Sequence, residues 1–148
     1  MYDFVDRRVT ALDPGSRFLV WSMRLWVTAI GLGQCPTPAV APAFARWRAI
    51  GALPAFMKAM ALLNRDAMET FHFRPLACEC VSEHEAIILS VIRSMHEGRY
   101  IDATETLALL VTCDSLGELV EAGSKLVQFL GPIGLCPARQ SAGATSTE

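Results

Sequence analysis

The chain has 148 residues, of which 52% are hydrophobic and 19% are charged, and its formal net charge is -2. This length fits one domain with a sizeable core, and the composition excludes disorder for most of the chain. A net charge so close to zero gives no argument for nucleic-acid binding.

The charges are unevenly distributed along the chain. Residues 1–65 carry eight basic and three acidic side chains, whereas residues 66–148 carry five basic and twelve acidic ones. The basic residues are scattered and form no run that would indicate nucleic acid or a membrane surface. The asymmetry predicts instead that the halves attract each other, within one chain or across a dimer.

The chain shows no targeting or membrane signal. Its first residues are charged and lack the apolar run of a signal peptide. The most hydrophobic stretch, residues 17–33, is short for a bilayer span and has Arg24 in its middle, so it predicts a buried helix. Five cysteines, an odd number, without an export signal predict a reducing cytosol and thiols that are free or bound to metal.

Helical patterns run through the whole chain, without strand alternation or a hairpin signal. The first strong helix is expected to begin with Asp13 as its cap and Pro14 in its first turn, and to end at the glycines of 31–33. Apart from a narrow polar stripe that includes Arg17 and Arg24, this helix is apolar on nearly all sides. Such a pattern is typical of a central helix surrounded by others.

A proline-rich segment over residues 35–42 predicts a stiff connector after this helix. A short helix around 42–50 and a longer one over roughly 54–65 should follow. The longer helix has room to continue through residues 66–71 but must end before Pro75.

The second half has the clearest helix-start signals. Ser82 and Glu85 fit a capping box ahead of an apolar helix that Gly98 closes. The next helix fits Asp102 as its cap.

A last helix is predicted from a second capping box, formed by Ser115 and Glu118, to the stop at Gly131. The small and polar tail of residues 137–148 is expected to be disordered. The sequence therefore predicts an all-α protein with a single helical domain over residues 1–136, a compact bundle of five to six helices with short connections.

The stretch HFRPLACECVSEHE, residues 72–85, gathers His72, Cys78, Cys80 and His84. Thiolate and imidazole are the ligands that zinc prefers, and four of them would complete a tetrahedral site. Structural zinc sites usually leave two to four residues between paired cysteines, and only one stands here. The spacing therefore favours ordinary thiols over a metal site.

Redox sensing is another interpretation of the same stretch. Cys80 stands just before the predicted cap Ser82, where the helix dipole would lower the pKa of a thiol. Three nearby glutamates act in the opposite direction. Cys35 and Cys136 each precede a proline, as cysteines at some iron–sulfur sites do, but both fit better as helix stops.

Partner binding has one weak indication in the sequence. Trp21 lies near the polar stripe of Arg17 and Arg24, and an exposed aromatic beside arginine suits a protein interface. Such an interface predicts an exposed apolar patch near Trp21 or Trp47. We therefore assign these four residues as interface candidates.

No catalytic motif is present: the sequence has no nucleophile-elbow motif, no phosphate-binding glycine loop and no His-Glu-x-x-His. The sequence favours a small cytosolic protein without enzymatic activity and without a resident cofactor. It would act through contacts with a protein partner or as a homo-oligomer, with no nucleic acid and no membrane span. The alternative is a metal-binding or redox-sensing module centred on Cys78, Cys80 and His84, with zinc or iron as the metal.

Overall fold

The computed structural model describes residues 4–68 and 73–137. In these ranges the chain forms six α-helices and two short 3₁₀ helices, and no strand. The predicted all-α class and the number of helices are confirmed. None of the described helices combines the length and the apolar character needed to cross a bilayer. Of the tail predicted to be disordered, residues 137–148, only residue 137 belongs to the described residues.

The helices follow one another with short connections. Their bounds are α1 (Pro14–Gly31), α2 (Thr37–Arg46), α3 (Leu53–Asp66), α4 (Glu83–His96), α5 (Tyr100–Ala108) and α6 (Cys113–Leu130), with the 3₁₀ helices η1 (Val9–Ala11) before α1 and η2 (Ile50–Ala52) before α3.

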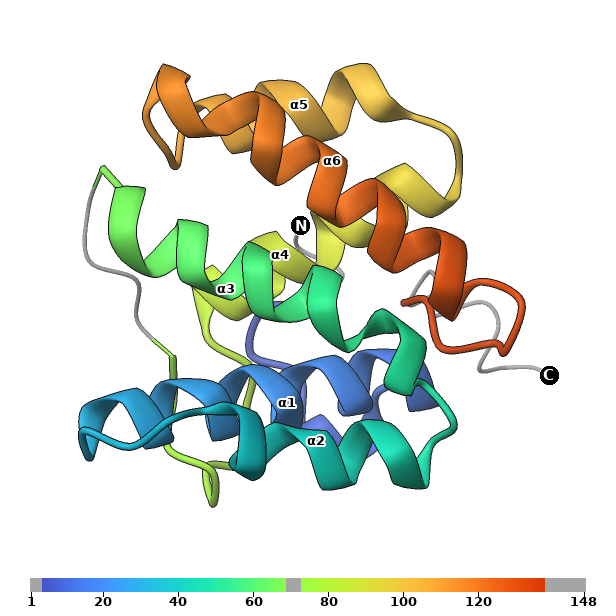
Figure 1. Cartoon of the computed structure of the whole chain (residues 1–148). Helices are drawn as coiled ribbons and strands as arrows, with labels where there is room; N and C mark the ends of the chain where they lie inside the picture. Colours follow the sequence, from blue (N-terminus) through green and yellow to red (C-terminus); the bar gives the residue numbers. More distant parts are fainter. Residues whose placement is uncertain (1–3, 69–72, 138–148) are drawn as a thin grey trace, which may run out of the picture.

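The helices lie in three layers (Figure 1). Helices α1 and α2 lie side by side at the bottom of the view, α3 and α4 cross the middle, and α5 and α6 cover the top. The contacts between α3 and α6, α4 and α5, and α1 and α2 are the most extensive. Residues 73–82, which precede α4, pass α1 on their way to the middle layer.

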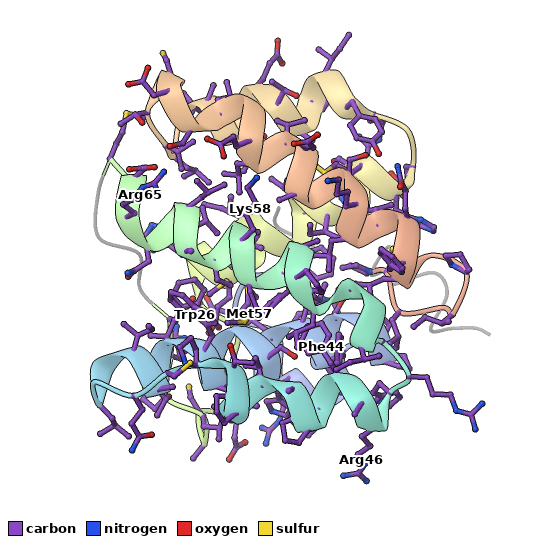
Figure 2. All side chains as sticks on the ribbon, viewed as in Figure 1. Trp26, Phe44, Arg46, Met57, Lys58 and Arg65 are labelled. Carbon is purple, nitrogen blue, oxygen red and sulfur yellow. The ribbon has the colours of Figure 1, made fainter. Side chains whose placement is uncertain are left out.

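Aromatic side chains fill the space between the bottom and the middle layer. The ring centroids of Phe18 and Phe44 are 4.8 Å apart in an edge-to-face arrangement, and those of Phe44 and Phe56 are 5.1 Å apart. Figure 2 shows Phe44, Met57 and Trp26 in this space. Each aromatic pair of this kind adds about 0.5–1.5 kcal/mol beyond the burial of its apolar area.

The start of α1 follows the sequence prediction. The carboxylate of Asp13 accepts a hydrogen bond from the Ser16 backbone N–H at 3.0 Å, and Pro14 occupies the first turn. Gly15 lies beside the returning C-terminal segment, and a Cβ atom there would come closer than 3.0 Å to backbone atoms of Leu135 and Cys136. The fold therefore needs a glycine at this position for close backbone approach.

The connector predicted over residues 35–42 is wrong, because most of it belongs to α2. Pro38 lies in the first turn, where no backbone N–H is needed within the helix. Pro42 lies inside the helix at an exposed position. Val40 and Phe44 are completely buried, and their packing compensates for the hydrogen bond that Pro42 cannot make.

Two predicted helix caps are also wrong. Asp102 lies within the first turn of α5, and α6 begins earlier than expected, with Thr112 as its N-cap. The capping box of Ser115 and Glu118 does not form, because the Ser115 hydroxyl donates a hydrogen bond to the carboxylate of Asp66 at the end of α3. A tertiary contact has taken the place of the local one.

Asp66 is the acceptor of two side chains. The guanidinium of Arg65 donates to it at 2.6 Å and 2.9 Å, and the Ser115 hydroxyl donates to the same oxygen. These hydrogen bonds, that of Arg65 first, hold the pKa of the Asp66 carboxyl below its usual value.

Candidate functional site

Two predicted interface residues line an apolar groove formed by α1, α2 and the segment that precedes α4. It has a volume of about 650 Å³. Its walls are Trp21, Leu25, Ala39, Pro42, Ala43, Arg46, Trp47 and Leu76, and we call it the tryptophan groove. Trp21 is 42% exposed and Trp47 is 41% exposed, so both indole rings are only partly covered by the fold. The structure thus brings two of the four interface candidates into one groove.

Positive charge surrounds the tryptophan groove. Arg46 extends from α2 away from the bundle (Figure 2) and makes no hydrogen bond or ion pair within the part of the chain that the structure describes. Arg17, a half-buried residue on α1, precedes Trp21 by one helical turn. Neither α1 nor α2 contains an acidic residue, so the surface of this layer is basic and aromatic.

Arg24, another interface candidate, does not line the groove. Its side chain is fully buried, and so is that of Glu85. The Arg24 Nε donates to Glu85 Oε2 at 2.8 Å, and Nη2 donates to Glu85 Oε1 at 2.9 Å. This bidentate geometry is the strong form of an ion pair.

The remaining donors of Arg24 hold the segment that precedes α4. Nη1 donates to the carbonyl of Cys78 at 2.7 Å, and Nη2 donates to the carbonyl of Cys80 at 2.9 Å. The backbone of the same segment pairs with the N-terminal residues, because the Val9 N–H donates to the Glu79 carbonyl at 2.7 Å. We call residues 73–82 the strap, since they are fixed on both sides.

Glu85 completes this network from the helix side. Its carboxylate accepts from the backbone N–H of Ser82 at 2.9 Å and of Arg74 at 3.0 Å. The Ser82 hydroxyl in turn accepts from the Glu85 N–H at 3.2 Å. The capping box predicted at the start of α4 is confirmed, and its glutamate serves Arg24 as well.

The strap has a direct connection to the tryptophan groove. Leu76 lies in the turn that the hydrogen bond from Cys78 N–H to the Pro75 carbonyl closes at 2.9 Å, and Leu76 forms part of the groove wall. By holding the Cys78 carbonyl, Arg24 positions this wall from inside the fold. Arg24 is therefore a support behind the groove.

The described residues do not assemble the predicted metal ligands. Within residues 4–68 and 73–137, no three histidine, cysteine or acidic side chains converge on a point that could hold a metal. The Cys78 thiol donates to the carbonyl of Cys80 at 3.6 Å, and His84 is buried on α4 beside a different groove. His72 lies outside the described residues. A zinc or iron site stays a prediction, for which the metal content of the purified protein is the test.

All five cysteines are free thiols with different surroundings. Cys35 and Cys113 are exposed. Cys136 is buried under the end of α6, and burial, with a smaller contribution from Asp13, raises the pKa of its thiol to about 11. At neutral pH Cys136 is therefore an unreactive thiol.

Sequence reasoning missed Leu76, Arg46 and the partner of Arg24. Leu76 and Arg46 come from a loop and a helix end that carry no periodic pattern marking a groove. Arg24 did give a signal, since an arginine among buried apolar positions requires an acidic partner. Its identity depends on a contact across 61 residues of sequence.

No protein-family model matches this chain, and neither the curated proteins nor the solved structures show a significant similarity to it.

Proposed function

We propose that this protein is a small cytosolic helical module without enzymatic activity, which binds a protein partner in the tryptophan groove. The observation that carries the proposal is the convergence of two half-exposed tryptophans, Leu76 and Arg46 on one groove. Tryptophan and arginine are the residues most enriched among those that dominate binding energies. Five free thiols accord with a reducing compartment.

The proposed occupant is a segment of another protein that has apolar anchors and flanking acidic residues. The apolar walls of the groove suit a buried anchor, and Arg46, which has no partner among the described residues, suits a carboxylate at the rim. A symmetric dimer through this face would place the Arg46 side chains of two copies close together, which is unfavourable. A second copy of the chain is therefore the less suitable occupant, and it becomes an outcome of the test.

Selection from a displayed library of random peptides tests this proposal. On the wild-type protein we expect enriched peptides that combine aromatic or aliphatic anchors with an excess of Asp and Glu. Trp21→Ala should weaken their binding at least tenfold, because a central aromatic anchor contributes about 2 kcal/mol or more. Ile101→Ala is the matched control, because Ile101 is an apolar side chain on α5 that is 76% exposed.

Charge reversal at the rim, Arg46→Glu, should remove the preference for acidic peptides and leave the fold intact. Peptides that bind Trp21→Ala as tightly as wild type would overturn the proposal. Analytical ultracentrifugation provides the second readout. A wild-type dimer that Trp21→Ala converts to monomer would show that a second copy occupies the groove, contrary to the proposal.

A further inference from the structure

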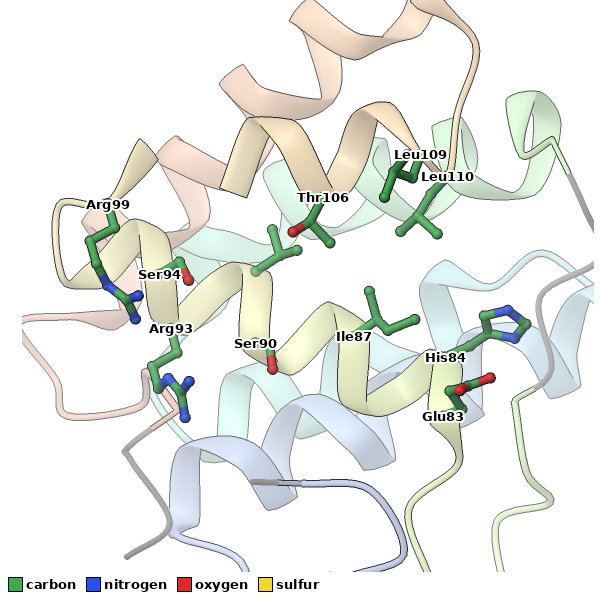
Figure 3. A pocket seen from close by; sticks show the side chains of 11 residues that line it. Glu83, His84, Ile87, Ser90, Arg93, Ser94, Arg99, Thr106, Leu109 and Leu110 are labelled. Carbon is green, nitrogen blue, oxygen red and sulfur yellow. The ribbon is translucent and has the colours of Figure 1, made fainter. Parts of the chain in front are cut away.

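A second groove, independent of the tryptophan groove, runs between α4 and α5. It has a volume of about 500 Å³, which is within the range of small-molecule sites. Along α4 it extends from Glu83 to Ser94, which corresponds to about 16 Å of helix. Figure 3 shows its two ends, with Arg93 and Arg99 at one and His84 and Glu83 at the other.

One end of the groove is cationic. Arg93 is only 7% exposed, and its guanidinium lies 5.3 Å from the centre of the Phe4 ring while it lines the groove. Arg99 contributes a second guanidinium from the turn between the helices. Arg99 also pairs with Glu97 at 2.5 Å and with Asp102 at 3.5 Å, and neither carboxylate lines the groove. Such exposed pairs are weak and exchange readily for another anion.

Hydroxyl groups accompany the two arginines. Ser90 and Ser94 are one turn apart on α4 and line the same stretch of the groove. The Ser90 Oγ is inaccessible to solvent and has no hydrogen-bond partner among the residues that the structure describes. A ligand oxygen in the groove therefore cannot reach the Ser90 hydroxyl, and Ser94 supplies the hydroxyl that can donate to an anion there.

The remaining walls are apolar. Ile87 and Val91 of α4 face Leu109 and Leu110, which follow α5. This part lies between the hydroxyl groups and the His84 end, so an apolar chain whose head is at Arg93 would run along it. The groove thus has a positive head site and an apolar channel.

From this arrangement we propose that the α4–α5 groove is a binding site for a single-chain amphipathic anion, a carboxylate or phosphate with an aliphatic tail. The anionic head accepts hydrogen bonds from Arg99 and the Ser94 hydroxyl, beside the positive charge of Arg93. The tail lies on Ile87, Val91 and the two leucines. The site is separate from the tryptophan groove, so a result that refutes one proposal leaves the other unaffected.

Isothermal titration calorimetry with decanoate is the direct test, with decanol as the uncharged probe of the same chain length. We expect saturable binding of decanoate, at least tenfold tighter than that of decanol. Arg99→Ala should weaken decanoate binding about tenfold, as expected for a hydrogen bond to a charged group. Trp21→Ala should leave it unchanged.

Ser94→Ala gives a second readout. It removes the hydroxyl beside the cationic end, so decanoate binding should weaken about five- to tenfold. Ser90→Ala is the matched control, because the Ser90 hydroxyl, one turn away on α4, is inaccessible to solvent and has no partner among the described residues. It should leave decanoate binding unchanged, and the free protein should be as stable as wild type or more stable.

Three results would overturn the proposal. The first is equal binding of decanol and decanoate, which would leave the cationic end without a role. The second is wild-type decanoate affinity in Ser94→Ala and Arg99→Ala. The third is binding to vesicles that contain anionic phospholipid without any binding of free decanoate, which would make the groove part of a membrane surface site.

Discussion

Replacement of Glu85 by glutamine tests whether the buried ion pair holds the strap. The substitution keeps the shape of the side chain and removes its charge. The carboxylate accepts four hydrogen bonds, two from Arg24 and one each from the backbone N–H groups of Ser82 and Arg74. The amide oxygen of glutamine can replace one carboxylate oxygen, while its NH₂ group faces donors and cannot accept from them.

The expected loss is large because Arg24 keeps its charge inside the fold. A buried charge deprived of its partner typically costs 3–5 kcal/mol, and each donor left without an acceptor belongs to that cost at about 1–3 kcal/mol. Since domains of this size have a free energy of unfolding of about 5–15 kcal/mol, Glu85→Gln removes about a fifth of it or more.

The double variant Arg24→Met/Glu85→Leu separates the ion pair from the network. Replacing a buried pair by apolar side chains is often neutral. Here it would leave the carbonyls of Cys78 and Cys80 and the N–H groups of the strap without their present partners. We therefore expect the double variant to be destabilised as well, but by less than the sum of the single variants, because the two side chains are coupled.

Urea unfolding followed by far-ultraviolet circular dichroism measures these differences. The matched control is Glu79→Gln, which removes a carboxylate from an exposed pair with Arg8 and should cost at most about 1 kcal/mol. The reasoning is refuted if Glu85→Gln is no more destabilising than Glu79→Gln, since the strap would then be held by its other contacts.

Three further outcomes follow from single positions. Gly15→Ala should destabilise the fold by about 1–3 kcal/mol or more, because rigid backbone occupies the space that its Cβ would need. Gly117→Ala, whose Cβ would lie in open space on α6, should raise the stability by about 0.5–1 kcal/mol in the same urea titration. The Asp66 carboxyl has a lowered pKa in the folded protein, so it stabilises the fold above about pH 4, its usual pKa in the unfolded chain. This contribution disappears as the pH falls through the folded-state pKa. The difference in melting temperature between wild type and Asp66→Asn should therefore close in acid. With a thiol reagent at pH 8, the exposed Cys35 should react rapidly, and Cys136 should react only on unfolding because the pKa of this buried thiol is about 11. Mass spectrometry of the labelled peptides measures the two rates. Labelling of Cys136 before Cys35 would contradict this prediction.

Local signals in the sequence were sufficient for the helices that begin with their own caps. Asp13 and the Ser82–Glu85 box act within one turn, and the structure forms both as predicted. Ser115 has an equally good local pattern, but its hydroxyl serves Asp66, which is 49 residues away in the sequence. Local capping patterns fail where a tertiary acceptor competes for the same donor.

The prolines of residues 35–42 are a second case in which tertiary packing overrides a local sequence pattern. A proline inside a helix is unfavourable locally, and the pattern therefore predicted a connector. Val40 and Phe44 are completely buried, and the Phe44 ring packs against Phe18 of α1 and Phe56 of α3. Burial of this size, about 1.5–3 kcal/mol for each large side chain, overrides the local preference.

The buried network and the proposed binding surface are two sides of one arrangement. Arg24 lies three residues after Trp21 on α1, so the exposed indole and the buried guanidinium belong to adjacent sides of the same helix. The guanidinium holds the strap through the Cys78 carbonyl, and the turn that ends at Cys78 presents Leu76 to the groove. A substitution of Glu85 therefore changes no atom of the groove surface, yet it releases one of its walls. Loss of peptide binding in Glu85→Gln under conditions where the protein is still folded would follow from this coupling, whereas Glu79→Gln, on the exposed side of the strap, would retain it.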